Sequence, residues 1–401
     1  MVRPVSISIN PNFDKNDIKL VNCLRKGNIV CGGATEKLKL EIENFFDGKK
    51  VIIMENGRSS LKLALKALGI SRGDEVIIQA FTCSVVPMAI LSLGAKVVYV
   101  DIDKFYNIDL NELKNKINKK TKAVVVQHTF GKPVDMCRLR RIVGNDIKIV
   151  EDLAHGLGNS YKGKSLGLWG DVAVLSFGRD KVISGVWGGA IVVNKEIEMI
   201  IKKMIKKFPK RNSIWIKKQL DYVWWSDLAM KFYGLGVGKL IHWWIKKSDW
   251  FDKPLSIEEK SGRMGTIYNG LPDELSFLIL NQWVKLIFFI KRRKEIAKIY
   301  SRYLGGFFDR ESSYLRYSIE MDNPYKLRLY AAKKNVFLGD WYDQVVAPKS
   351  VDVKVFGYQN GVCCKAEEKS RMVVNLPTNP NLTDKQVMKV IKVVKKWKLK
   401  K

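Results

Sequence analysis

The chain has 401 residues, 46% of them hydrophobic and 28% charged, which is typical of a folded protein with one large and one smaller domain. Its 71 lysines and arginines against 40 acidic residues give a formal net charge of +31. The sequence contains no repeat of roughly 20–50 residues and no apolar run of about 18 residues, which argues against solenoids, propellers and transmembrane helices.

Three explanations compete for the positive charge. Nucleic-acid binding would require the charge on one face together with base-stacking aromatic residues. An acidic ligand or an anionic membrane would require local basic patches. The third explanation is a lysine-rich composition spread over solvated faces. Lysines occur in every segment, without a helix-turn-helix, zinc-finger or RNP-like pattern. We therefore favour the third explanation, keep the second open and expect no nucleic-acid partner.

Residues from about 50 to 195 alternate between β-rich and helical segments. We predict strands at 51–54, 75–79, 95–100, 122–128, 147–152, 171–177 and 189–194, and helices at 59–68, 85–93 and 110–117. Strands separated by such helices favour βαβ crossovers and a mainly parallel sheet covered on both faces. Because ligands collect beyond the carboxyl ends of such strands, the polar residues that follow them are the candidate site residues.

Residues 197–262 break this alternation and contain six of the 11 tryptophans. After them, 273–304 is predicted as one long helix or two, and the C-terminal part ends on a basic amphipathic helix at 383–398. We expect a large domain from 1–200, completed by about 263–300, a helical insertion at 201–262, and a small α+β domain at 301–401.

The cysteines and histidines indicate a reduced, metal-free protein. The six cysteines show no C-x-x-C spacing, and no apolar segment of the signal-peptide type stands at the N-terminus. This pattern is typical of a cytoplasmic protein with free thiols. Only three histidines are present, and no close cluster of His, Asp and Glu surrounds them, so we expect no metal site.

Three segments that follow predicted strands contain candidate ligands for an anionic cofactor. The first, NGRSS at 56–60, contains Gly57 between a strand and a helix, where free N–H groups favour a phosphate. The second, EDLAHG at 151–156, places Asp152 at a strand end, and the third, SFGRDK at 176–181, places Lys181 just after one. Each alone has an ordinary alternative: a helix cap, a structural acid or a surface lysine.

The order and spacing of these segments resemble the DegT/DnrJ/EryC1/StrS family of sugar aminotransferases, which are pyridoxal-phosphate (PLP) enzymes of fold type I. The resemblance covers roughly 30–195 strongly and 265–400 loosely. The matching segments are 56–61 (NGRSSL), 73–77 (GDEVI), 94–101 (GAKVVYVD), 121–124 (TKAV), 131–136 (GKPVDM), 151–158, 170–171, 176–181, 375–378 (NLPT) and 382–383 (LT).

The resemblance implies a mainly parallel seven-stranded sheet between helices, a smaller C-terminal domain and PLP as cofactor. Lys181 would carry the cofactor as a Schiff base and move a proton during the reaction. Asp152 would pair with the ring nitrogen. His155 would hydrogen-bond the phenolic oxygen of the cofactor.

The resemblance also implies a homodimer with shared active sites. The phosphate would be held by Gly57, Arg58, Ser59 and Ser176. Tyr268 or Asn269 would be the residue that each chain contributes to its partner's site.

The sequence departs from the family in two places. Cys83 stands where family members usually have an aromatic residue that stacks on the cofactor, with Phe81 two residues earlier, so the stacking residue is left open. The partner-chain segment usually contains an Asn-Tyr-Arg-like run, whereas this chain has Tyr268-Asn269-Gly270. A related dehydratase branch has histidine in place of the Schiff-base lysine, and Lys181 argues against that branch.

We therefore expect an aminotransferase that moves an amino group from an amino acid, glutamate being the first choice, to a nucleotide-linked keto sugar in the biosynthesis of cell-surface polysaccharide or another glycan. A cyclitol aminotransferase, a PLP-fold regulator and a basic binding protein stay open as alternatives. Residues 205–260 are expected to form a helical hairpin that packs on the body or the dimer partner. The alternative is peripheral docking on an anionic membrane, which this mixture of tryptophan and lysine also suits.

Overall fold

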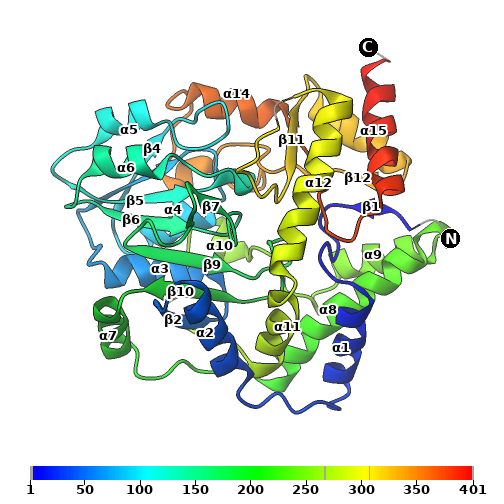
Figure 1. Cartoon of the computed structure of the whole chain (residues 1–401), viewed down its shortest axis with the longest axis horizontal. Helices are drawn as coiled ribbons and strands as arrows, with labels where there is room; N and C mark the ends of the chain where they lie inside the picture. Colours follow the sequence, from blue (N-terminus) through cyan, green and yellow to red (C-terminus); the bar gives the residue numbers. More distant parts are fainter. Residues whose placement is uncertain (1–2, 266–267, 307, 400–401) are drawn as a thin grey trace.

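The computed structural model describes residues 3–265, 268–306 and 308–399. Its centre is a seven-stranded sheet with the order β4-β3-β5-β6-β9-β10-β2 (Figure 1). The strands are β2 (Lys50–Met54), β3 (Glu75–Gln79), β4 (Lys96–Val100), β5 (Thr121–Gln127), β6 (Lys148–Asp152), β9 (Val172–Ser176) and β10 (Gly189–Val193). All run parallel except β10, which is antiparallel to β2 and β9. The predicted sheet is confirmed, and each strand ends within one residue of its predicted bounds.

Both faces of the sheet are buried, which explains its continuous runs of Val and Ile. In β5, Val124 and Val126 belong to one hydrophobic core and Val125 to the other, as the alternation of side chains along a strand requires. The second core contains residues of α3 (Gly57–Ala67) and α4 (Val85–Leu91), and the first contains residues of α2 (Ala34–Phe45), α6 (Met136–Val143) and α11 (Asp273–Trp283).

The segment predicted as one or two helices forms two, α11 and α12 (Leu286–Leu304). The C-terminal part contains the pair β11 (Tyr317–Glu320) and β13 (Val373–Leu376), together with α13 (Pro324–Lys333), α14 (Cys364–Met372) and α15 (Asp384–Lys398). The N-terminal strand β1 (Val5–Ser6) pairs with β12 (Val336–Phe337) in this part of the molecule. Val5 shares a core with residues of α12 and α15, so the chain's first strand lies with its C-terminal elements.

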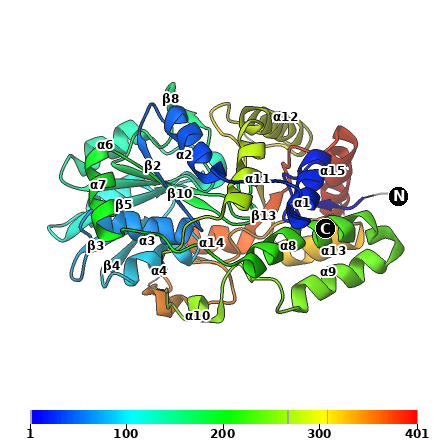
Figure 2. The same cartoon turned by 90° about the horizontal axis from the view of Figure 1, so that it is seen from below.

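Residues 201–262 are mostly helical, in α8 (Ser213–Lys231), α9 (Val237–Lys247) and α10 (Ile257–Lys260), after α7 (Lys195–Met204). Helices α8 and α9 lie side by side at the end of the molecule opposite α5 (Leu110–Lys116) and α6 (Figures 1 and 2). Helix α8 is held to α1 (Lys15–Arg25) by Arg25, which pairs with Asp221 at 2.6 Å and covers the Trp224 ring. Within the described ranges, no helix is both long and apolar enough to cross a membrane.

Candidate active site

The candidate site is built where the carboxyl ends of β2, β6 and β9 meet. The turn after β2 and the end of β9 are in direct contact: a Cβ added to Gly57 would lie 2.9 Å from Ser176 Cβ. Only glycine therefore allows this approach. Asn56 caps α3 by accepting a hydrogen bond from the backbone N–H of Ser59 (2.9 Å). The sequence segments at 56–60 and 176–181, far apart in the chain, thus form one wall of the site.

Lys181 lies in the turn after β9, where hydrogen bonds to its own backbone carbonyl and the next one hold it in place. The side-chain amide of Asn12 donates hydrogen bonds to the carbonyls of Lys181 (2.8 Å) and Val182 (3.0 Å). Asn12 is in turn fixed by Arg293, which donates to its Oδ1 at 2.6 Å. Burial lowers the pKa of the Lys181 amine, while the nearby carboxylate of Asp152 acts in the opposite direction. The amine is therefore closer to its neutral, nucleophilic form than a surface lysine is.

Asp152, the last residue of β6, is a buried carboxylate that accepts one hydrogen bond, from the Ala154 N–H at 2.9 Å. Burial raises its pKa, against the effects of that hydrogen bond and of the charge on Lys181. Its neighbour Glu151 has a different role. Glu151 accepts from the backbone N–H groups of residues 167, 169 and 170, and its Oε2 lies 3.3 Å from His128 Nε2, so it fixes the loop that follows. Of these two adjacent acids, Glu151 is therefore structural and Asp152 is the carboxylate at the site.

His155 stands in a stack of parallel rings. Its ring lies 5.9 Å from Phe130 at 11° and 5.2 Å from Trp341 at 14°. The Phe130 N–H donates to Nδ1 (3.3 Å), which leaves the proton on Nε2, 3.4 Å from the Tyr342 hydroxyl. Burial, together with the charges of Lys181 and Arg316, lowers the pKa of His155 well below its usual value. The ring is neutral and offers one N–H.

The buried neutral His155 predicts a pH dependence of stability. Because the folded ring resists a proton that the unfolded chain accepts near pH 6.5, stability is lost as the pH falls below that value. Between about pH 7.5 and 5.5, the wild type should lose about 1.4 kcal/mol of unfolding free energy more than His155→Gln does. Urea denaturation at both pH values measures the difference, since groups common to both proteins cancel. Equal losses would contradict a buried, neutral His155.

Trp341 and Arg316 are the residues of this cluster that sequence reasoning missed. Lys181 Nζ lies 4.8 Å from the centre of the Trp341 ring, and the Arg316 guanidinium lies 3.7 Å from it. The backbone N–H of Trp341 donates to Asn375 Oδ1 at 2.8 Å, so the C-terminal segment at 375–378 helps to fix the residue that carries this ring. The sequence pointed to the segment at 375–378 as a family motif, but it did not show which residue that segment would contact.

The two candidates for ring stacking lie in different surroundings. Phe81 is fully buried and packs against Tyr106 (5.1 Å) and Tyr342 (5.2 Å) in the core. Cys83 is half-buried and lies close enough to Lys181 to affect its pKa, after burial and Asp152. Among the described residues, the aromatic ring that faces the amine of Lys181 is that of Trp341, from the C-terminal half of the chain.

The side chain of Arg58 is already bound within the chain. It pairs with Glu259, donates to the Pro254 carbonyl (2.8 Å) and lies over the Trp187 ring (5.2 Å). Asn269 lies beside the same turn, where its carbonyl accepts from the Glu55 N–H at 3.0 Å, and Tyr268 is half-buried next to it. The region predicted to reach a partner's site therefore lies near this chain's own turn at 55–57.

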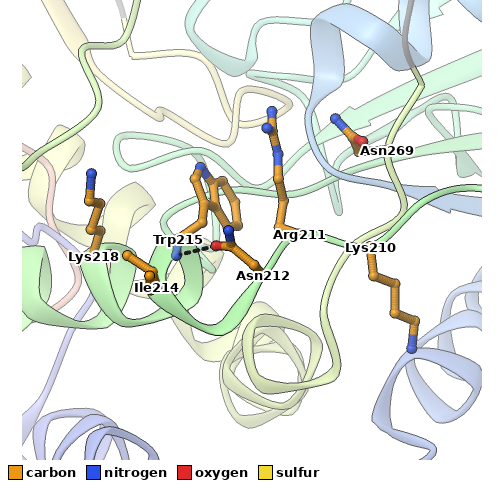
Figure 3. A pocket seen from close by; sticks show the side chains of 7 residues that line it. All are labelled: Lys210, Arg211, Asn212, Ile214, Trp215, Lys218 and Asn269. Carbon is orange, nitrogen blue, oxygen red and sulfur yellow. Dashed lines mark hydrogen bonds between the residues drawn. The ribbon is translucent and has the colours of Figure 1, made fainter.

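A basic cavity of about 460 Å³ opens beside that turn (Figure 3). It is lined by Lys210, Arg211, Asn212, Ile214, Trp215, Lys218 and Asn269. Arg211 forms two hydrogen bonds with Glu55 (2.7 and 3.0 Å), directly before the capping residue of α3. Figure 3 shows Trp215 between Lys218 and Arg211, whereas Lys210 points away, toward its ion pair with Asp273 (3.3 Å).

Comparisons with known proteins identify the family of this chain. The model of the DegT/DnrJ/EryC1/StrS aminotransferase family matches residues 12–240 and 243–395. An uncharacterised protein of Methanocaldococcus jannaschii is 27% identical over 94% of this chain and 93% of its own length. GDP-perosamine synthase of Vibrio cholerae is 33% identical over 56% of this chain and 60% of that enzyme.

Solved structures share the fold. Helicobacter pylori PseC, an aminotransferase of pseudoaminic acid biosynthesis, superposes with a TM-score of 0.74 and 21% identity, over 98% of this chain and 99% of its own. A Streptococcus pneumoniae protein assigned as a sugar aminotransferase, solved in its PLP form, superposes with a TM-score of 0.71 and 22% identity, over 97% of each chain. The predicted fold class, enzyme class and cofactor are thereby confirmed. This chain belongs to the DegT/DnrJ/EryC1/StrS aminotransferase family, whose aminotransferases depend on PLP.

Proposed function

We propose that this protein transfers an amino group from an amino acid, with glutamate as the donor, to a nucleotide-linked keto sugar in the biosynthesis of a cell-surface glycan. The observation that carries the proposal is the buried pair of Lys181 and Asp152, beyond the strand ends and beside a glycine turn. The substrate class is supported by relatives such as GDP-perosamine synthase, to which the chain is similar over about half its length.

The residues present fit PLP. Lys181 would bind it covalently, and Asp152, which accepts one hydrogen bond from the described residues, has acceptor capacity left for a ring N–H. The close approach at Gly57 brings the N-terminus of α3 against Ser176, and the free N–H groups of this helix start suit a phosphate held by the backbone of Arg58 and by Ser59 and Ser176. Bound PLP supplies an electron sink for breaking the C–H bond beside the amino group.

The chain's own residues then have separate tasks. The amine of Lys181, whose lowered pKa favours its neutral form, would accept the proton from Cα of the amino acid and deliver it to C4′ of the cofactor. The neutral His155 offers its Nε2–H to an oxygen. Trp341, over the amine of Lys181, excludes water from that side.

The basic cavity of Figure 3 is suited to the phosphates of a nucleotide. Arg211 and Lys218 come from the segment before and within α8, and both stand beside the Trp215 ring, on which a base could stack. The cavity borders the turn at 55–57, so a sugar attached to phosphates bound there would extend toward the phosphate end of the cofactor site.

Absorbance tests the reaction. The purified protein with PLP should show a band at about 400–430 nm, and glutamate should remove it. Adding GDP-4-keto-6-deoxymannose or another nucleotide keto sugar should restore it, and mass spectrometry should detect the aminated sugar. A protein that responds to glutamate but only to a keto cyclitol would support the cyclitol alternative. A protein that lacks the band, or whose band responds to no amino acid, would instead support the alternative of a regulator or a basic binding protein.

We also propose that the protein is a homodimer. Apolar side chains of α11–α12 are strongly exposed in the single chain, among them Val284 (82%), Ile287 (66%) and Phe288 (60%). Such a patch is typical of a surface that a partner covers. Light scattering should give about twice the chain mass of 45.9 kDa, and Phe288→Asp should shift the protein toward the monomer. A monomeric wild type would contradict the homodimer.

Peripheral membrane contact is a third proposal, supported by the surface of α9. Leu240 (68% exposed) and Trp243 (62%) point to solvent on a helix that ends on Lys246 and Lys247 and carries no acidic residue. Flotation with vesicles containing anionic lipid should recover the wild type in the lipid layer, and Leu240→Ser/Trp243→Ser less. Val355→Ser, at an exposed position elsewhere, is the control. Equal recovery of all three proteins would contradict membrane contact through α9.

A further inference from the structure

Arg316 is a buried arginine with unused hydrogen-bond donors. Its residue is 3% exposed, and it stands just before β11. A guanidinium has five N–H donors and keeps its charge in proteins. Within the described part of the chain, Arg316 donates one hydrogen bond, to Asp180 Oδ2, at a long 3.4 Å. Its buried Nε has no partner among these residues. A buried charge so incompletely paired is costly unless a ligand completes its hydrogen bonds.

The guanidinium lies at the reacting end of the site. Arg316 and Lys181 both contact the Trp341 ring, at 3.7 and 4.8 Å from its centre. His155 stacks against the same ring, and the charge of Arg316 contributes to lowering the pKa of His155, after burial and Lys181. The charge of Arg316 also contributes to lowering the pKa of Lys181, so the guanidinium and the amine are neighbours.

The local charges leave room for an anion. Asp180 is the sole acid paired with Arg316 in the described structure, and burial raises its pKa. Arg179, next to Asp180, also has a buried nitrogen without a partner in the described residues. Asp340, whose charge also acts on Arg316, pairs with Arg328 at 3.4 Å. With Asp152 assigned to the cofactor ring, these three arginines exceed Asp180 and Asp340 by one positive charge.

The backbone around Arg316 is adapted to it. A Cβ added to Gly339 would lie 3.1 Å from Arg316 Nη1, so glycine at that position leaves space for the guanidinium. Gly339 is also bonded through its backbone to Asn375, the residue that fixes Trp341. The position of Arg316 is therefore determined by the fold and does not depend on Asp180 alone.

We propose that Arg316 binds a carboxylate of the amino donor. An amino acid carries a carboxylate on the reacting carbon, whereas a keto sugar reacts at a ring carbon that carries none. A planar guanidinium matches a carboxylate through two parallel hydrogen bonds, which a lysine cannot make. This inference rests on the proposed function and adds to it the residue that selects the donor.

The two half-reactions separate this role from a structural one. The PLP form is mixed with glutamate, and the protein reconstituted with pyridoxamine phosphate is mixed with GDP-4-keto-6-deoxymannose, both followed by absorbance. Arg316→Leu should lower kcat/KM for glutamate about 100-fold and change the sugar half-reaction less than threefold. Arg316→Lys should recover part of the loss. Arg371→Leu, at an exposed arginine of the same part of the molecule, is the matched control.

Binding of glutarate, a dicarboxylate without an amine, gives a readout that needs no turnover. Calorimetry should show that glutarate binds to the PLP-loaded wild type. Arg316→Leu should lose glutarate affinity by a factor similar to its loss of kcat/KM for glutamate. Equal damage to both half-reactions, or unchanged glutamate and glutarate affinity, would overturn the role of Arg316. A wild type that binds glutarate through Arg316 but reacts with no keto sugar would instead contradict the proposed acceptor.

Discussion

Lys181→Ala should lower the rate of full turnover by about 10⁴-fold or more, because it removes both the covalent anchor and the proton carrier. The amine is buried and its pKa is lowered, which favours the neutral form that both tasks require. Steady-state amination of the sugar measures the effect. The band at about 400–430 nm should disappear at the same time.

Lys119→Ala is a suitable comparison for Lys181→Ala, because Lys119 is exposed in the turn between α5 and β5, at the end of β5 opposite the site. It should retain both the band and the rate. Lys181→Arg keeps the positive charge but cannot form the covalent bond, and it should be as inactive as the alanine variant. Full turnover by Lys181→Ala would refute the assignment of Lys181.

The sheet could be predicted closely because its signal is local. Runs such as 75–79 (EVIIQ) are buried along their whole length in the structure, and their Val and Ile content marks them in the sequence. The candidate site could be predicted in part for the same reason. Gly57, Asp152, Ser176 and Lys181 follow strands whose carboxyl ends meet at one edge, so knowing the strands was enough to place these residues together.

Trp341 and Arg316 could not be predicted by this reasoning. They come from loops of the C-terminal half and reach Lys181 only because that half folds back onto the sheet. The pairing of Asp180 with Arg316 joins residues 136 positions apart and leaves no periodic pattern in the sequence. Cys83 showed that the aromatic residue usual at this position in the family is absent here. The sequence did not show which ring lies near the Lys181 amine, because that depends on a long-range contact.

Asp152→Asn should retain the covalent band but lower the rate of amination by about 10³-fold. The carboxylate of Asp152 is buried and close to Lys181, where it would keep the ring nitrogen of the cofactor protonated. An amide cannot supply that negative charge, so the cofactor would bind and yet accept electrons poorly. Absorbance and steady-state amination, measured on the same sample, separate the two effects.

Glu151→Gln is the matched control, since Glu151 is the adjacent residue, equally buried and also a carboxylate. Its oxygens accept hydrogen bonds from three backbone N–H groups of the loop at 167–170. The substitution should therefore lower the melting temperature, because an amide replaces one acceptor with a donor. The rate per folded molecule should stay close to that of the wild type. If Glu151→Gln and Asp152→Asn both kept their stability and lost the same activity, the division of this pair into a structural and a cofactor-binding acid would be wrong.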